Sequence, residues 1–291
     1  MRIRSAVLYE MGLSQPYGES KPLRVEELEL DAPGEGEVLV EIKAAGLCHS
    51  DLSVINGDRP RPTPMALGHE AAGVVAALGA GVSDPKPGDH VVMVFVPSCG
   101  HCLPCAQGRP ALCEPGLQAN TAGTLASGAR RLHRNGDDIN HHMGVSAFSS
   151  HTVVSRHSLV KVDPELALEE AALFGCAVIT GVGAVVNTAK VEPGSSVAVV
   201  GLGGVGLNAL LGAHVAGAQR IVTIDVLPEK LELARELGAT DTFNAGDDRC
   251  AEQVKEATAG GVDYAFEMVG SVQAMELAYR ITRRGGTTIS A

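Results

Sequence analysis

Four cysteines within fifteen positions form the densest group of metal-binding side chains in this 291-residue chain. They are Cys99, Cys102, Cys105 and Cys113, with the spacing C-x2-C-x2-C-x7-C. Four thiolates on one short loop can complete a tetrahedral shell around zinc without help from the rest of the fold, so we predict a structural zinc. An iron–sulfur cluster and a redox or disulfide pair are the alternatives.

Three more potential ligands lie outside that loop and far apart in the chain. Cys48 belongs to the segment GLCHSD, His69 to the segment GHE, and Cys176 to the segment FGCAV. Taken singly, none of them requires a metal, because the cysteines fit buried thiols and the histidine fits a hydrogen-bonded core residue. Their spacing cannot join them, so only the fold could bring them together.

A glycine-rich turn indicates a dinucleotide site. We assign cofactor binding to Gly201, Gly203, Gly204, Val205 and Gly206. The turn matches G-x-G-x-x-G, which lets a pyrophosphate approach the backbone where a strand gives way to a helix. Asp225 follows Gly206 by nineteen positions, where a carboxylate binds ribose hydroxyls and repels a 2′-phosphate, so NAD is favoured over NADP. Lys230 either reaches the adenosine ribose or is a solvated helix lysine.

These residues need a scaffold, and the first half of the chain has the pattern of β structure. Glu37–Lys43 alternates apolar and polar residues as a half-buried strand does, and His90–Pro97 is an apolar run. Short strands with frequent Gly and Pro predict a small barrel. Residues 114–144 are polar and unpatterned, which predicts a long loop. The adjacent His141 and His142 are expected to be solvated rather than ligating, and neither is assigned a role.

The second half alternates strands with helices. Five strands are expected, at Ser195–Gly201, Arg220–Asp225, Thr242–Asn244, Val262–Val269 and Gly286–Ala291. One helix is expected over Leu207–Ala216, and another between Pro228 and Gly238. The alternation predicts a doubly wound parallel sheet covered on both faces. Because that fold has six strands, the sheet is expected to lack its last strand and the chain to be incomplete at its C-terminus.

Composition narrows the classes of protein that remain. The chain has 23 Lys and Arg against 34 Asp and Glu, a formal charge of −11, and 45% hydrophobic residues. A core of that size excludes general disorder, and the acidic balance argues against nucleic-acid or membrane-surface partners. No apolar run reaches the ~18 residues of a spanning helix, and Met1–Gly12 lacks the apolar core of a signal peptide. We therefore expect a cytoplasmic protein.

Several segments, in this order, resemble the zinc-dependent medium-chain alcohol dehydrogenases: GLCHSD, GHEAAGVV, KPGDHVV, the four-cysteine lobe, FGCAVITGVGAV and GLGGVG. The likeness runs from about Arg4 to the end of the chain. It implies a two-domain α/β protein, with a GroES-like β-barrel catalytic domain over residues 1–177 and a Rossmann-type NAD-binding domain over residues 178–291. In the family, the segment beyond the present C-terminus supplies much of the dimer contact, so a homo-oligomer is expected for the complete protein.

The resemblance also implies roles for individual residues. Cys48, His69 and Cys176 are similar to the three ligands of the catalytic zinc. Glu70 resembles an acid that can transiently approach the metal, and Asp51 resembles the carboxylate that holds the ligand histidine.

Further positions concern the proton and the cofactor. Ser50 resembles the hydroxyl that takes the substrate's proton, and His49 lies where the family has a basic residue near the pyrophosphate. Thr180 and Val205 match positions that pack against the nicotinamide ring. Many relatives end the proton relay in a histidine three positions after the serine; here that position is Ser53, which leaves water or the ribose hydroxyls to complete the path.

The implied activity is oxidation of a primary or secondary alcohol to an aldehyde or ketone. Coordination to Zn²⁺ lowers the pKa of the alcohol hydroxyl, an alkoxide forms, and hydride passes to NAD. The loop over residues 114–144 is expected to border the substrate pocket. Three alternatives remain: a glutathione-linked formaldehyde dehydrogenase, a truncated fragment that binds zinc and NAD without turnover, and a zinc–thiolate redox sensor built on Cys99–Cys113.

Overall fold

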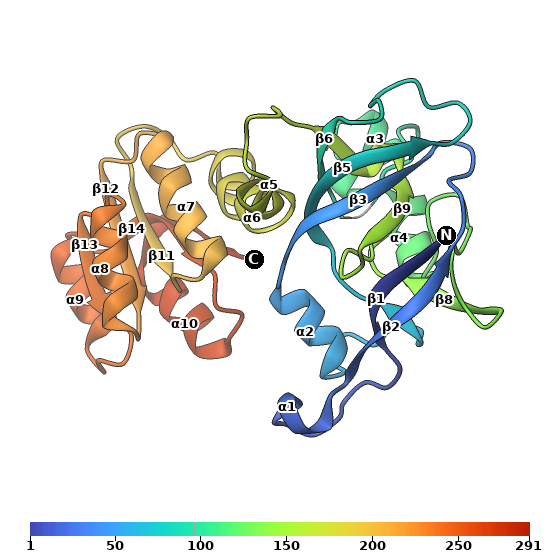
Figure 1. The fold of residues 1–291 in the computed structure, drawn as a ribbon. Coiled ribbons are helices and arrows are strands. Elements are labelled where there is room, and N and C mark those ends of the chain that lie inside the picture. The colour runs from blue at the N-terminus through green and yellow to red at the C-terminus, as the bar shows by residue number, and fades with distance from the viewer. Residues whose placement is uncertain (96) are drawn as a thin grey trace. The chain divides into compact units, whose positions relative to one another are not determined.

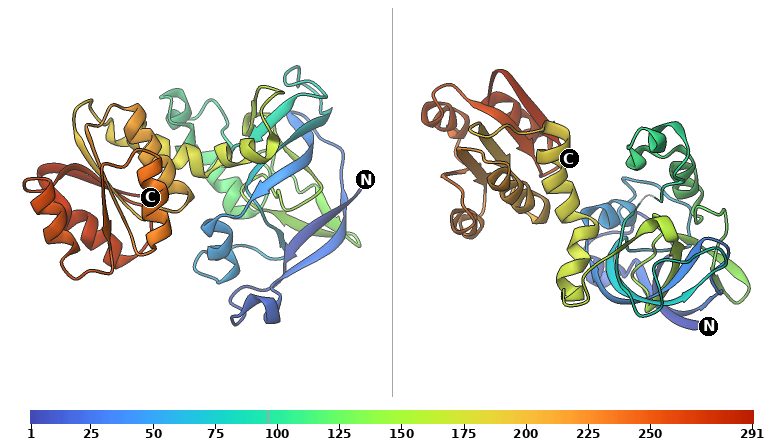
Figure 2. Two further views of the ribbon diagram at one scale, coloured as in Figure 1. Left: turned by 60° about the vertical axis from the view of Figure 1, so that its left-hand side comes forward. Right: turned by 90° about the horizontal axis from the view of Figure 1, so that it is seen from above.

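The chain folds into two compact units, Met1–Cys176 and Ala177–Ala291 (Figures 1 and 2). The structure is a computed structural model that describes residues 1–95 and 97–291. The first unit holds two β-sheets, and the second holds one sheet flanked by helices. The expected order of a small β-barrel followed by a parallel α/β sheet is therefore confirmed.

The first sheet is a closed barrel in the order β1-β2-β7-β8-β4. Its strands are β1 (Arg2–Leu8), β2 (Leu23–Leu30), β4 (Met65–Ala66), β7 (Leu132–Arg134) and β8 (Asp137–His141). All neighbours run antiparallel except β4 and β8, which pair in parallel. Apolar side chains from the strands fill the interior, among them Val7, Leu28 and Ile139.

The second sheet of this unit is antiparallel throughout, in the order β10-β6-β5-β3-β9. Its strands are β3 (Glu37–Gly46), β5 (Glu70–Leu78), β6 (His90–Met93), β9 (His151–Ser155) and β10 (Leu159–Lys161). The run expected to be a strand over residues 90–97 ends as a strand at Met93, and Val96 within it lies outside the described residues.

Short helices connect the strands of the first unit. They are α1 (Tyr17–Ser20), α2 (His49–Ile55), α3 (Leu103–Ala106), η1 (Pro110–Leu112), α4 (Glu114–Ala122), η2 (Arg156–Ser158), α5 (Leu168–Ala171) and η3 (Ala172–Gly175). The expectation of a long loop over residues 114–144 is wrong, because α4, β7 and β8 occupy most of that segment. The two histidines at its end are not solvated either: His141 and His142 are 0% and 1% exposed. Closure of the barrel by β7 and β8 buries them.

The second unit is built on a parallel five-stranded sheet in the order β13-β12-β11-β14-β15. Its strands are β11 (Ser196–Val200), β12 (Arg220–Asp225), β13 (Asp241–Asn244), β14 (Val262–Glu267) and β15 (Thr282–Ser290). This is the order of the first five strands of the doubly wound nucleotide fold. The five strands expected from the sequence are confirmed.

Helices cover both faces of this sheet (Figure 2). They are α6 (Ala177–Gly183), η4 (Ala184–Ala189), α7 (Gly204–Val215), α8 (Pro228–Glu236), α9 (Cys250–Ala257) and α10 (Val272–Ile281). In β11, Val197 and Val199 pack with α7 and α8, whereas Ala198 and Val200 pack with α9 and α10. Because successive strand residues point to opposite faces, a strand between two helical layers must be apolar at every position.

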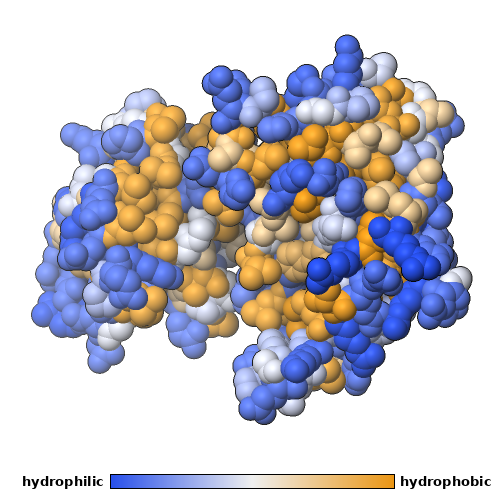
Figure 3. All heavy atoms as spheres, viewed as in Figure 1, coloured by the Kyte–Doolittle hydropathy of each residue, from blue (hydrophilic) through white to orange (hydrophobic). Residues whose placement is uncertain are grey.

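One helix of this unit also carries apolar surface. α7 packs against α6 and η4 as well as the sheet, and Leu211 and Val215 on it remain exposed. Figure 3 shows the resulting hydrophobic area over this helix. Among residues 1–95 and 97–291, no single helix is long and apolar enough to cross a bilayer; the bent pair Leu168–Gly175 and Ala177–Ala189 meets the length and composition test only when its parts are combined.

Because His141, the last residue of β8, is buried, we expect acid to lower the stability of the barrel. Its ring is fully buried, Nε2 accepts a hydrogen bond from the Arg131 amide (3.1 Å), and burial lowers its pKa to about 3. Histidine in an unfolded chain has a pKa of ~6.5, so below that pH only the unfolded chain takes up the proton. We expect His141 to lower the free energy of unfolding by up to about 1.4 kcal/mol per pH unit as pH falls from about 6 to about 4.

Denaturant titrations at a series of pH values measure this effect. His141→Gln should flatten the slope, because glutamine does not titrate and its side-chain oxygen can still accept the Arg131 amide. The matched control His157→Gln changes an exposed histidine of the same unit and should leave the slope as it was. An equal slope in unmutated protein and His141→Gln would contradict the prediction.

Candidate functional site

Three ligand-type side chains from distant positions converge in the first unit. Cys48 precedes α2, His69 lies between β4 and β5, and Cys176 follows η3. One ligand atom from each lies within 4.8 Å of the others, and the two Sγ atoms are 3.7 Å apart. Zinc–sulfur bonds of ~2.3 Å in a tetrahedron place two sulfurs about 3.8 Å apart. The donor set and its spacing therefore fit a zinc ion with three protein ligands and a fourth position for another group.

The buried Asp51 carboxylate joins the two loops that carry Cys48 and His69. Its Oδ2 accepts a hydrogen bond from the Cys48 amide (3.3 Å), and its Oδ1 accepts one from the Gly68 amide (3.2 Å). Oδ1 also lies 3.1 Å from Nδ1 of His69. Because Nδ1 of His69 faces the carboxylate, Nε2 is the nitrogen left for a metal, as in carboxylate–histidine–zinc triads.

Protons and a divalent cation would compete for the ligand atoms of this cluster. A hydrogen bond from Cys176, with help from His69, lowers the pKa of Cys48 to about 3, and the same pairing raises the pKa of Cys176. Burial acts to lower the pKa of His69, but the hydrogen bond with Asp51 and then the one with Cys48 raise it to about 9. The metal-free cluster therefore keeps protons on Cys176 and His69 that a bound cation would displace.

Of the other residues predicted for this site, His49 and Ser50 lie on α2 and Glu70 is the first residue of β5. Glu70 is buried, and its carboxylate lies over Gly46, where an added Cβ would be 2.9 Å from Oε2. Ser50 is half-buried in the first turn of α2, and His49 beside it is exposed. The Ser53 hydroxyl donates to the His49 carbonyl (3.0 Å), an arrangement that fixes the side chain on the helix backbone.

The four-cysteine loop forms a second cluster in the same unit. One ligand atom from each of four residues lies within 4.8 Å of the others: Cys99, Cys102, Cys105 and Cys113. Sγ of Cys102 is 3.9 Å from Sγ of Cys113, far beyond the ~2.05 Å of a disulfide, and all seven cysteines of the chain are free. Amides donate to the sulfurs, from Cys102 to Cys99 (3.3 Å) and from Gly116 to Cys113 (3.3 Å). Such donors stabilise thiolates, so this loop fits a closed tetrahedral zinc.

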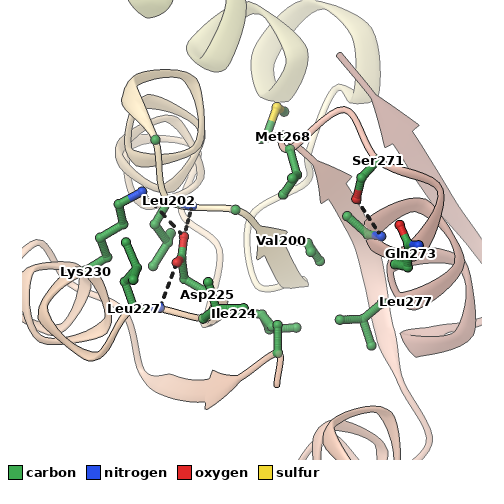
Figure 4. A pocket seen from close by; sticks show the side chains of 16 residues that line it. Val200, Leu202, Ile224, Asp225, Leu227, Lys230, Met268, Ser271, Gln273 and Leu277 are labelled. Atoms are coloured by element: carbon green, nitrogen blue, oxygen red, sulfur yellow. Dashed lines mark hydrogen bonds and ion pairs between the residues drawn. The ribbon is translucent and has the colours of Figure 1, made fainter. Parts of the chain in front are cut away.

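The second unit has a cavity of about 450 Å³ at the carboxyl ends of β11, β12 and β14 (Figure 4). Asp225 lies in its wall, where Oδ2 accepts a hydrogen bond from the Leu202 amide (2.7 Å) and Oδ1 accepts one from the Leu227 amide (3.0 Å). Nζ of Lys230 lies 4.0 Å from Oδ2. The carboxylate is thus held at the position where the sequence predicted a ribose contact.

The glycine-rich turn enters the same cavity. Gly201 has φ +91°, which side chains rarely adopt, and a Cβ on Gly206 would lie 1.8 Å from the Gly201 carbonyl oxygen. At Gly203 an added Cβ would meet nothing within 4 Å, so the backbone faces open space there. α7 begins at Gly204 with its amides next to that space. This arrangement fits the pyrophosphate of a dinucleotide.

Five predicted cofactor residues do not line that cavity: His49, Thr180, Gly204, Val205 and Gly206. Thr180 in α6 instead lines a separate hollow of about 340 Å³ together with residues of η4 and the end of β15. Val205 is half-buried in the first turn of α7, and a Cβ on Gly181 would lie 2.3 Å from its carbonyl oxygen, so α6 and α7 are in close contact. The structure therefore places Thr180 and Val205 in the second unit but apart from Asp225.

His142 lies at this site although the sequence did not predict it there. Its Nδ1 lies 3.3 Å from Asp51 Oδ1, and its ring meets that of His69 edge to face, with centroids 5.6 Å apart. Burial lowers the pKa of His142, so the ring is neutral at pH 7. The local sequence gives little indication that His142 is buried. Its one signal is the spacing of Ile139 and His141, which lie two positions apart, as residues on one face of a strand do.

Comparisons with known proteins find a matching family for each of the two units. Residues 34–164 match the family described as "Alcohol dehydrogenase GroES-like domain", and residues 204–291 match "Zinc-binding dehydrogenase". An S-(hydroxymethyl)glutathione dehydrogenase of Synechocystis sp. is 44% identical over 288 residues, which cover 98% of this chain and 76% of that protein.

Two solved structures are also similar. An alcohol dehydrogenase zinc-binding domain protein from Burkholderia ambifaria has a TM-score of 0.92 and 37% identity, covering 100% of this chain and 76% of that one. The benzyl alcohol dehydrogenase of Acinetobacter calcoaceticus has a TM-score of 0.91 and 34% identity, covering 100% of this chain and 77% of that one.

Proposed function

Because the chain belongs to the zinc-dependent medium-chain alcohol dehydrogenase family, we propose that it oxidises a primary or secondary alcohol to an aldehyde or ketone with NAD as the hydride acceptor. The observation that carries this proposal is the meeting of Cys48, His69 and Cys176, with Asp51 fixing the imidazole. A closed four-ligand site would have a structural role only; three ligands leave room for a substrate.

Cys48, His69 and Cys176 hold the catalytic zinc in this proposal. When bound, the metal supplies a Lewis acid that lowers the pKa of the substrate hydroxyl. Asp51 keeps the imidazole in the orientation that leaves Nε2 toward the metal, and the buried Glu70 is the acid near the ligands.

Ser50 takes the proton from the substrate hydroxyl and passes it outward from the first turn of α2. Ser53 does not act as the terminal base, because its hydroxyl already donates to the helix backbone. Water or the ribose hydroxyls of the cofactor would complete the path, and His49, which is exposed beside Ser50, would have the role toward the pyrophosphate that the family resemblance implies.

NAD occupies the cavity of the second unit. The glycine turn accommodates the pyrophosphate, Asp225 accepts hydrogen bonds from the ribose hydroxyls, and Lys230 lies close enough to contact the same ribose. Thr180 and Val205, which lie outside the lining of that cavity, would keep the contact with the nicotinamide ring that the family resemblance implies. The four-cysteine lobe binds a second, structural zinc.

The names of the relatives favour two classes of substrate. The Synechocystis protein is an S-(hydroxymethyl)glutathione dehydrogenase, and the Acinetobacter protein is a benzyl alcohol dehydrogenase. We include the glutathione adduct of formaldehyde as the second candidate substrate beside simple and aromatic alcohols. A cytoplasmic location and a homo-oligomer are part of the same proposal; the seven free thiols fit a reducing compartment.

The test is turnover by the purified chain together with its metal content. Formation of NADH or NADPH is measured with a simple primary alcohol, benzyl alcohol, and formaldehyde plus glutathione, each with NAD and with NADP. We expect two zinc ions per chain and NAD-dependent turnover of at least one substrate. Bound zinc without turnover of any of the three would support the inert-fragment alternative and contradict the proposal.

A further inference from the structure

His142 is a buried imidazole beside the metal cluster, and the proposed chemistry has no use for it. It follows β8, whose parallel pairing with β4 brings it next to the turn that carries His69. The backbone of His142 is fixed: its amide donates to the Ser146 hydroxyl (3.0 Å), and its carbonyl accepts from the amides of Val145 (2.9 Å) and Ser146 (3.1 Å).

The turn after His142 has an unusual backbone. Met143 and Ser146 both have φ +52°, in the left-handed region that costs a non-glycine residue about 1 kcal/mol. Strained positions of this kind are kept where the surrounding structure needs a particular geometry. Here the turn directs the ring of His142 toward Asp51, with Nδ1 3.3 Å from Oδ1.

Asp51 needs such a neighbour. Its carboxylate is 3% exposed, and among the described residues its ion-pair and hydrogen-bond partners are two amides and two imidazoles, without a lysine or arginine. A buried carboxylate is expensive unless donors surround it. One of the two imidazoles is the metal ligand itself, so His142 is the only side chain of the four partners that is free to support Asp51 independently of the metal.

We propose that His142 is a positioning residue: its buried ring, whose Nδ1 lies 3.3 Å from Oδ1 of Asp51 and has no hydrogen-bond partner elsewhere, holds the carboxylate that orients His69 for the metal. This inference rests on the proposed metal centre at Cys48, His69 and Cys176. Two competing roles are testable: the ring could serve only to fill space against His69, or Asp51, His69 and His142, which also lie within 4.8 Å of one another, could form a cation site of their own.

A matched pair of variants separates positioning from packing. His142→Asn places an amide near the position of Nδ1 and keeps a donor, whereas His142→Phe keeps a ring against His69 and removes the donor. The affinity of the Cys48 centre for Zn²⁺ and Co²⁺ is measured by chelator competition in the full chain, with the four-cysteine lobe as internal reference. Co²⁺ absorption bands report ligand geometry.

We expect His142→Phe to weaken metal binding at the Cys48 centre by about 10–100-fold and to shift its Co²⁺ bands, while His142→Asn stays within about threefold of the unmutated protein. The affinity of the lobe should not change. If His142 acts through Asp51, adding His142→Phe to Asp51→Asn should weaken binding little further. Equal losses in the Phe and Asn variants, or an unchanged Co²⁺ spectrum in His142→Phe, would overturn the inference.

A measurement on the unmutated protein covers the case in which a variant does not fold. The long-range ¹H–¹⁵N spectrum of the zinc-loaded chain should show His142 with hydrogen on Nδ1, and hydrogen on Nε2 alone would overturn the inference. A third metal ion per chain would favour the separate cation site and would count against the positioning role of His142. Absence of metal at the Cys48 centre in the unmutated protein would instead defeat the proposed function, so the two failures are distinguishable.

Discussion

Cys176→Ala is expected to lower kcat/KM for alcohol oxidation by at least about 10³-fold and to reduce bound zinc from two ions per chain to one. The sulfur of Cys176 lies 3.7 Å from that of Cys48, so one thiolate of the cluster is lost with the substitution. Stabilisation by a metal of the charge that develops during reaction amounts to several kcal/mol, and each 1.36 kcal/mol corresponds to a factor of about ten in rate. The measurement is steady-state kinetics with zinc analysis of the same preparation.

Cys250→Ala provides the control for losing a buried thiol. Cys250 is 2% exposed in the core formed with α9 and α10, and it belongs to neither metal cluster. That variant should lose some stability through the cavity it leaves, yet keep both zinc ions and its turnover. Retention of two zinc ions and full activity by Cys176→Ala would remove Cys176 from the ligand set.

The parts of the fold that were predictable are those whose signal is local. β11 is apolar from Val197 to Val200 because helices cover both faces of the sheet, and the glycine turn between β11 and α7 carries its own motif. The four-cysteine cluster was equally visible, since one short loop supplies every ligand. In each case the residues that specify the structure are neighbours in the chain.

The predictions that failed concern features of the fold that depend on contacts between distant segments of the chain. β7 has three residues and pairs with β2, about a hundred positions earlier, so no periodicity could mark it within residues 114–144. The burial of His142 depends on that same closure of the barrel. The convergence of Cys48, His69 and Cys176 likewise comes from the packing of separate elements, and before the structure only the family resemblance suggested it.

Asp225→Gly is expected to lower kcat/KM for NAD by about 10–100-fold and to raise the preference for NADP relative to NAD. Hydrogen bonds to a charged group contribute about 1.5–3 kcal/mol, which sets that range. Each oxygen of Asp225 accepts one backbone amide, from Leu202 or Leu227, and each has a further lone pair for a ribose hydroxyl. Removing the carboxylate also removes the charge that repels a 2′-phosphate. Initial rates over a range of each cofactor measure both effects.

A second substitution separates charge from the support that Asp225 gives to the turn. Asp225→Asn keeps one acceptor oxygen for the backbone amides but has no charge, so it should raise the NADP preference with a smaller loss for NAD than Asp225→Gly. Lys230→Gln tests whether the neighbouring ammonium group contributes to cofactor binding. Its Nζ is 4.0 Å from Oδ2 of Asp225. If Lys230 contacts the ribose, its loss weakens NAD binding without changing the preference toward NADP. An unchanged cofactor preference in both Asp225 variants would mean that the carboxylate serves only to fix the backbone, at Leu202 in the glycine turn and at Leu227 after β12.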